Sequence, residues 1–305
     1  MRRRAPPRGH ARPVGKPVAL VAIVLAAACA PGEPGSSGSG SASEASADAI
    51  RLVDAMGDTV TLPGYAHRIV SLVPSATETL QAIGAADALA GRTEFDTQPW
   101  AESVPSVGGG IEPDLEALVA LEPDLVIRFG GSQDPRTPAR LAELGIPSLA
   151  VRPDHVADIY DTAELLGAAT GHDAGADSLV ATLRSGLERL REAAATLPRK
   201  RVAYVLGGTP PWVSGPDTYI DEIVSLAGGD NVFSDLDALY APVSPEQLRT
   251  RDIDVVLVSS AESFDASLAP EARVASIGDL LEIPGPDVVD AAYRVAEALH
   301  GRSLR

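Results

Sequence analysis

Residues 114–127 read DLEALVALEPDLVI, and residues 244–258 repeat the pattern as SPEQLRTRDIDVVLV. Each stretch has a glutamate near its start, an aspartate eight residues later, and then an apolar run that predicts a strand. The two glutamates, Glu116 and Glu246, lie 130 residues apart. The repeat predicts two lobes of similar build, each with one glutamate at a helix N-terminus. The alternative interpretation is one helix–strand unit used twice, which α/β proteins do routinely.

Strand and helix patterns alternate on both sides of this repeat. Apolar runs predict strands over 68–73, 88–91, 125–129, 147–151, 202–206 and 255–258. Helical patterns fall at 75–84, 114–121, 135–144, 218–227, 244–251 and 287–300, with Ser75 and Glu78 as the expected capping box of the first helix. Residues 50–53 and 59–62 flank a turn and predict a hairpin. Alternation of this kind implies crossover connections and parallel sheets.

A long helix is expected between the two halves. Apolar residues from Ala176 to Leu190 recur at helical spacing. This predicts about 20 helical residues, or about 30 Å at 1.5 Å per residue. We therefore expect an α/β fold of two Rossmann-like lobes with parallel sheets joined by one long helix. Such a helix is stiffer than paired crossover strands, so we expect the lobes to move little.

The first 48 residues are expected to lie outside the fold. Residues 1–28 combine a basic start with the short apolar run from Val18 to Ala28, and small residues precede Cys29, the only cysteine. This order resembles a bacterial lipoprotein signal, with lipidation of Cys29 after cleavage; an uncleaved membrane anchor is the alternative. Residues 29–48 are rich in Gly and Ser and predict a flexible tether. The expected organisation is then an N-terminal lobe at 49–152, a connecting helix region at 153–198 and a C-terminal lobe at 199–305.

The charge of the chain limits its partners. The formal charge is −17, and removal of residues 1–28 takes away six of the 25 Lys and Arg and none of the 42 Asp and Glu, which leaves −23. Such a chain is a poor match for nucleic acid and suits an exported protein. The histidines show no metal-ligand spacing, and no catalytic triad, acid pair or phosphate loop stands out. We therefore expect no cofactor, no metal and no enzymatic activity.

Five segments carry a family resemblance. They are IVSLVPSATE at 69–78, LVALEPDLVI at 118–127, PPWVSG at 210–215, LAGGDNVF at 226–233 and VSPEQL at 243–248. The segments resemble those of ABC-transporter substrate-binding lipoproteins of the cobalamin and siderophore family, the helical-backbone class III of periplasmic binding proteins. The likeness is greatest to the cobalamin-binding members. The chain departs from them at Val107-Gly108-Gly109, where they carry a tryptophan.

The resemblance implies a corrinoid ligand, held between the lobes. Aromatic side chains can stack on the flat ring of such a ligand, and backbone amides can meet its polar edge. The expected ligand-binding residues are Ser75, Ala76, Phe95, Phe129, Gly131, Trp212 and Tyr240. Glu116 and Glu246 match glutamates that pair with arginines on the two permease subunits. The expected partners are an ABC permease dimer with its ATPase subunits, and a membrane reached through lipidated Cys29.

Two alternatives remain open from the sequence. A ferric-siderophore or haem receptor of the same family would favour cleft arginines, for which Arg92, Arg128 and Arg152 are candidates, or an axial ligand such as Tyr240. A two-lobed α/β enzyme would need a titratable constellation between its lobes. The sequence offers only scattered Asp and Glu for such a role.

Overall fold

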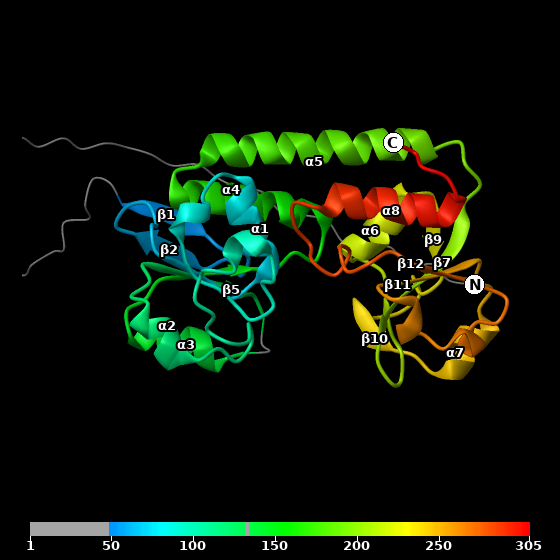
Figure 1. Ribbon diagram of the computed structural model, residues 1–305, viewed down its shortest axis with the longest axis horizontal. Coiled ribbons are helices and arrows are strands. Elements are labelled where there is room, and N and C mark those ends of the chain that lie inside the picture. The colour runs from blue at the N-terminus through cyan, green and yellow to red at the C-terminus, as the bar shows by residue number, and fades with distance from the viewer. Residues whose placement is uncertain (1–48, 132–133) are drawn as a thin grey trace, which may run out of the picture. The chain divides into compact units, whose positions relative to one another are not determined.

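The computed structural model describes residues 49–131 and 134–305, which belong to one compact unit. The expected signal segment 1–28, Cys29 and the tether 29–48 lie outside the described residues. The fold is α/β, with a two-stranded hairpin followed by two larger sheets in successive parts of the chain (Figure 1), as the sequence predicts. No helix in the described part is both long enough and apolar enough to span a bilayer.

The described chain opens with the predicted hairpin, β1 (Ile50–Val53) and β2 (Thr59–Leu62). Asp54 closes it, because one carboxylate oxygen accepts hydrogen bonds from the backbone N–H groups of Met56 and Asp58. The other oxygen accepts from the N–H of Ala150, in β6 (Ser148–Val151) of the first sheet. One buried carboxylate therefore fastens the hairpin to the first lobe.

The first sheet has the strand order β4 (Leu89–Gly91), β3 (Ile69–Ser71), β5 (Leu125–Phe129) and β6, all parallel. Alternate side chains of β3 enter different cores: Ile69 packs with α1 (Pro74–Ala82), whereas Val70 packs with α2 (Leu115–Ala120) and α3 (Arg136–Glu143). Helices therefore cover both faces, and the loops after β3 and β5 emerge at one edge, where α/β sheets bind ligands.

The second sheet has a parallel centre formed by β7 (Lys200–Gly207), β11 (Val255–Val258) and β12 (Arg273–Ser276). β9 (Gly229–Asn231) runs parallel to the first half of β7. Two antiparallel strands, β8 (Trp212–Ser214) and β10 (Tyr240–Pro242), extend the sheet beyond the second half of β7. The four residues between β7 and β8 are too few for a crossover, so this part of the sheet is a hairpin rather than a parallel addition.

Helices also cover both faces of the second sheet. α6 (Tyr219–Leu226) and α8 (Val288–His300) pack on the face that carries Val202 and Tyr204. α7 (Pro245–Thr250) packs on the opposite face through Leu248 (Figure 1). Both α2 and α7, the helices of the sequence repeat, thus lie on the face of their sheet that faces away from α5 (Asp173–Ala194).

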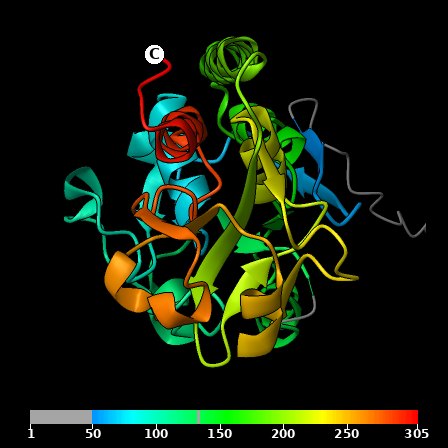
Figure 2. The same ribbon diagram turned by 90° about the vertical axis from the view of Figure 1, so that its right-hand side faces the viewer.

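The predicted long helix is α5, with 22 residues, and a second helix that the sequence did not predict, α4 (Val156–Thr170), precedes it. Two glycines let α5 contact helices of both lobes. A Cβ at Gly175 would stand 2.0 Å from the carbonyl oxygen of Ile83 at the end of α1, and one at Gly186 would stand 2.7 Å from Val289 of α8. Figure 2 shows α5 and α8 end-on beside one another. α5 is therefore a shared support of the two lobes.

The capping box predicted at Ser75 and Glu78 is wrong. α1 begins at Pro74, with Val73 as its N-cap and no side-chain cap. Proline suits the first helical position, since its φ is preset and its missing N–H would have had no partner there. Glu78 instead accepts a hydrogen bond from Gln98 Nε2 at 2.5 Å. Ser244 caps α7, and Asp114 caps α2, through side-chain hydrogen bonds to backbone N–H groups.

Candidate ligand-binding site

A pocket of about 700 Å³ opens where the chain leaves β3 and β5 in the first lobe. Its lining comes from three segments that the parallel sheet brings together. They are the entry to α1 (Leu72, Val73, Pro74), the loop after β4 (Glu94, Phe95) and the glycine-rich loop before α2 (Gly109, Gly110, Ile111, Glu112), with Phe129 at the end of β5. We call this feature the first-lobe pocket.

The first-lobe pocket gathers large apolar side chains that are not buried. Phe95 is 61% exposed, Ile111 48% and Phe129 44%. Single exposed apolar residues need no explanation, but three around one pocket form a candidate binding surface. Phe95 and Phe129 were predicted from the sequence to contact a ligand, and the structure brings these two together.

Hydrogen bonds within the turn 93–96 stabilise the loop that carries Phe95. Buried Asp96 accepts hydrogen bonds from the N–H of Thr93 at 2.8 Å and from its hydroxyl at 2.6 Å. The same hydroxyl accepts from the N–H of Phe95 at 3.2 Å. Because this turn is internally bonded, Phe95 is presented outward by a preorganised backbone rather than by a free loop.

The glycine run before α2 forms one wall of the pocket. A Cβ at Gly110 would stand 2.4 Å from the carbonyl oxygen of Leu72, so only glycine lets this loop lie against the end of β3. Gly108 has φ +84° and its carbonyl accepts from the N–H of Glu94. The run is therefore a tight structural turn, and it also brings backbone to the pocket surface.

The other first-lobe residues predicted to bind the ligand, Gly131, Ser75 and Ala76, lie outside the first-lobe pocket. Gly131 lines a small neighbouring hollow that shares Gly110, Ile111 and Phe129 with the first-lobe pocket. Ser75 is 4% exposed and Ala76 is fully buried, because the start of α1 packs into the core. Gly285, in the segment before α8, lies against Ser75. The structure does not bring Ser75 and Ala76 to the pocket surface.

Trp212 and Tyr240 belong to the second lobe. They lie on the antiparallel ribbon of β8 and β10, where Trp212 is opposite Pro242 and Tyr240 is opposite Ser214. Residues that face one another across such a pair, and those two apart along a strand, share one face. Trp212 and Tyr240 are therefore neighbours on one face, with Trp212 45% exposed and Tyr240 half-buried.

The phenol of Tyr240 stays protonated. Burial, reinforced by the negative charge of Asp154, raises its pKa to about 12. Two more buried phenols belong to the same cluster: Tyr219 donates a hydrogen bond to the carbonyl oxygen of Leu281, and Tyr204 donates to Glu282 at 3.5 Å. Burial raises the pKa of both. Of the three phenols, only the neutral one of Tyr240 belongs to a side chain that is partly exposed.

No basic side chain lines the first-lobe pocket within the described residues; its charged members are Glu94 and Glu112. The three arginines considered from the sequence are engaged elsewhere. Arg92 donates to the carbonyls of Ala101 and Thr93, both at 2.9 Å. Arg128 donates to Ser148 and lies 3.9 Å from Asp54, and Arg152 pairs with Asp154 at 2.6 Å.

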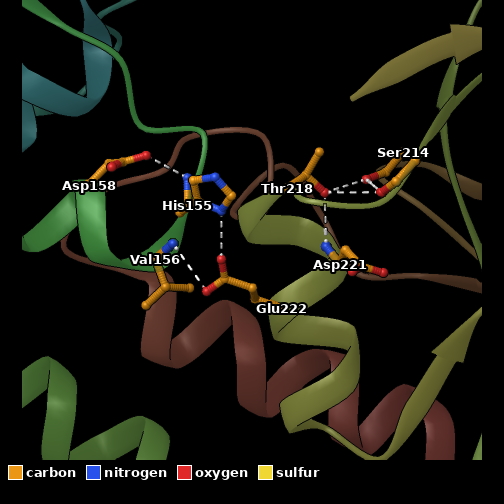
Figure 3. Close-up of polar contacts among 8 residues, drawn as sticks. His155, Val156, Asp158, Ser214, Thr218, Asp221 and Glu222 are labelled. Atoms are coloured by element: carbon orange, nitrogen blue, oxygen red, sulfur yellow. Dashed lines mark hydrogen bonds and ion pairs between the residues drawn. The ribbon is translucent and has the colours of Figure 1, made fainter. Parts of the chain in front are cut away.

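The first lobe is joined to α6 of the second at the start of α4. Figure 3 shows His155 and Glu222 pointing toward one another, with Nδ1 and Oε1 2.9 Å apart. The other oxygen of Glu222 accepts from the N–H of Val156 at 3.3 Å. The N–H of Tyr219, the first residue of α6, donates to the carbonyl of Asp154. The hydrogen bond to Glu222 raises the pKa of His155, with the charges of Asp158 and Asp154 adding to the effect.

Glu116 and Glu246 occupy the second position of α2 and α7, as predicted, and both are exposed. Within the described residues, neither carboxylate has a hydrogen-bond or ion-pair partner. Their places at helix N-termini favour negative charge there through the helix dipole. The described residues contain no group of three or more His, Cys, Asp or Glu side chains that could bind a metal.

The sequence did not point to Ile111 or Glu94 as parts of a pocket. Ile111 is the one apolar residue in an otherwise polar and glycine-rich stretch, which is a weak signal for an exposed contact. Glu94 precedes Phe95 in a loop with no periodic pattern. Their proximity depends on how the loops after β3, β4 and β5 fold over one sheet edge.

Comparison with known proteins gives three consistent results. Residues 69–275 match the sequence profile of the family described as periplasmic binding protein. The chain is 32% identical over 206 residues to a vitamin B12-binding protein of Yersinia pestis (strain Pestoides F), covering 67% of this chain and 74% of that protein. The periplasmic vitamin B12 binding protein BtuF of Vibrio cholerae has a similar fold, with a TM-score of 0.66, 27% identity and coverage of 76% and 96%.

A haem-binding relative shares the fold as well. The periplasmic heme-binding protein RhuT from Roseiflexus sp. RS-1 superposes with a TM-score of 0.66 over 76% of this chain and 99% of its own, at 24% identity. The profile match spans most of the two lobes, and the two-lobed α/β structure agrees with it. The chain therefore belongs to the periplasmic binding protein family.

Proposed function

We propose that this protein captures a cobalamin or related corrinoid outside the cytoplasm and delivers it to an ABC importer. The observation that carries the proposal is the first-lobe pocket, with Phe95 and Phe129 exposed beside Ile111. Flat ring faces bury well against such side chains. The relatives named for vitamin B12 binding support this ligand class.

The rim of the pocket suits the edge of a corrinoid. That edge carries amides, whose N–H groups can donate to carboxylates and whose carbonyls can accept from backbone N–H groups. Glu94 and the backbone of Gly109 and Gly110 supply both kinds of partner. Trp212 and Tyr240 are proposed to complete the grip from the second lobe, through an indole and a neutral phenol.

The ferric-siderophore and haem alternatives gain less support. An anionic chelate calls for free cationic side chains, whereas Arg92, Arg128 and Arg152 are all engaged with other groups. Haem ligation by Tyr240 would call for a phenolate, and burial disfavours that form. The haem-binding relative, at 24% identity, supports the fold alone.

The proposed role includes delivery. Export and anchoring through lipidated Cys29 follow from the basic, apolar and small-residue order of the first 29 residues. Glu116 and Glu246 are proposed to dock on arginines of the permease subunits, one per lobe. Their exposure, and the position of α2 and α7 on corresponding sheet faces, support two simultaneous contacts.

Purification of the protein from cells fed with corrinoid, haem and a ferric siderophore together tests the ligand class. We expect the visible spectrum of the purified protein to be that of a corrinoid. A haem Soret band, or a siderophore charge-transfer band with no corrinoid absorption, would overturn the assignment.

A further inference from the structure

The acidic side chains of the first-lobe pocket bear on which ligands it accepts. This inference rests on the proposed function. We propose that Glu94, assisted by Glu112, makes the pocket reject ligands that carry carboxylates at their edge and favour those with amide or cationic edges. Both side chains are exposed and both line the pocket. They are its only charged members within the described residues.

Glu94 is the stronger of the two determinants. Its carboxylate has no hydrogen-bond or ion-pair partner among the described residues, so its charge is not offset locally. Glu112 lies 3.0 Å from Arg136 Nη2, but the two side chains are 79% and 84% exposed. A pair that exposed is strongly screened and holds its partner loosely. The net charge of these groups at the pocket is therefore negative.

Two other arginines of the first lobe, Arg128 and Arg92, are engaged by groups outside the pocket. Arg128 directly precedes Phe129 in β5, and adjacent strand residues point to opposite faces. Arg128 does not line the first-lobe pocket but lines the small neighbouring hollow, and its guanidinium donates to Ser148 and lies 3.9 Å from buried Asp54. Arg92 precedes Glu94 by two residues, but its guanidinium bonds three backbone carbonyls, including those of Ala101 and Thr93. Neither guanidinium lines the first-lobe pocket itself.

The expected discrimination is measurable. Two like charges about 6 Å apart in a partly desolvated pocket, at an effective dielectric constant of about 40, repel enough to weaken binding about tenfold. An amide at the same place would instead donate a charge-assisted hydrogen bond to Glu94. The contrast between amide and carboxylate should therefore reach at least about tenfold, and it should shrink as salt is added.

The test compares cyanocobalamin with its monocarboxylic acids, in which one peripheral amide has become a carboxylate. The ring, the size and the central metal are unchanged, so only the charge and the hydrogen-bonding character of one edge group differ. Calorimetric titrations would use the wild-type protein, Glu94→Gln, Glu112→Gln and the double variant, at low and high salt. Glu192→Gln, on the exposed surface of α5, is the matched control.

We expect the wild type and the control to prefer the amide at least about tenfold for one or more of the acids. Glu94→Gln should remove most of that preference, and the double variant nearly all of it. Equal affinity of the wild type for amide and acids, or an unchanged preference in Glu94→Gln, would overturn the charge rule alone. If cyanocobalamin itself does not bind, the proposed function fails, and the charge rule fails with it.

Discussion

His155 and Glu222 are 67 residues apart in the chain and 2.9 Å apart in the structure, where they tie the start of α4 to α6. Protonated His155 makes an ion pair with Glu222, whereas the neutral ring keeps only a hydrogen bond. Glu222 also accepts from the N–H of Val156, so part of the connection does not depend on pH.

The first prediction is a pH-dependent stability contribution from this pair. The folded-state pKa of His155 is raised above its usual 6.5, so the contribution is fully present below pH 6.5 and is lost as pH rises through the folded pKa. Both side chains are more than a third exposed, which limits the effect to about 1 kcal/mol or less. Urea unfolding of His155→Gln should show a larger loss of stability at pH 6 than at pH 8.5. His67→Gln, an exposed control, should show no such difference; equal losses for His155→Gln at both pH values would contradict this account.

The second prediction concerns the aromatic contacts. Phe95→Ala, Phe129→Ala, Trp212→Ala and Tyr240→Ala should each weaken corrinoid binding by about 1–3 kcal/mol, or about 5- to 150-fold, through lost burial and ring contact. Leu144→Ala is the matched control, since Leu144 is 40% exposed and lies outside the first-lobe pocket. If the four variants bind as tightly as the control, these side chains do not grip the ligand.

The third prediction separates delivery from binding. Glu116→Ala combined with Glu246→Ala should abolish uptake of labelled ligand by cells while leaving affinity nearly unchanged, because neither carboxylate lines the pocket. Glu164→Ala, an exposed glutamate of α4, serves as the control for general charge loss. Normal transport by the double variant would remove the docking role.

The fourth prediction concerns anchoring. Cys29→Ser should move the protein from the membrane fraction to the soluble extract, because the thiol that accepts the lipid is absent. Fractionation followed by immunoblotting measures this. A Cys29→Ser protein that still sediments with membranes like the wild type would refute the lipoprotein interpretation.

The aspartates of the sequence repeat have a structural role, whereas its glutamates have no intramolecular partner within the described residues. Asp124 accepts from the N–H groups of His67 and Arg68, just before β3. Asp254 accepts in the same way from the N–H of Arg201 in β7, and the bond with the Arg201 side chain lowers the pKa of Asp254 to about 2. The aspartates therefore hold the first strand of each sheet in place. Glu116 makes no comparable contact within the described residues.

Helix caps and strands were predictable where the local pattern agreed with the tertiary fold. Asp114 and Ser244 cap the helices that the sequence predicts, and the strand runs from 125 to 129 and from 255 to 258 are the observed ones. α4 was not predicted although Val156, Ile159, Ala163 and Leu166 recur at helical spacing, because Ala157, Leu165 and Ala168 on the other side weaken the contrast between its faces. The capping box at Ser75 was wrong because the helix begins at Pro74, which moves the N-cap two residues earlier, from Ser75 to Val73.

Only some residues of the first-lobe pocket could be predicted from the sequence. The positions of Phe95 and Phe129, in a loop and at a strand end, indicated exposure in advance. Glu94 and Ile111 come from loops that meet only because Gly110 allows a close approach to Leu72. Ser75 and Ala76, by contrast, belong to a motif that the fold buries.

The central claim is that this protein binds a corrinoid. Calorimetric titration of the purified protein with cyanocobalamin, with haem and a ferric siderophore titrated in parallel, tests it most directly. The account predicts saturable one-to-one binding of cyanocobalamin, with much weaker binding of the two other ligands. Absence of cyanocobalamin binding at tens of micromolar ligand, together with tight binding of haem or the siderophore, would contradict it.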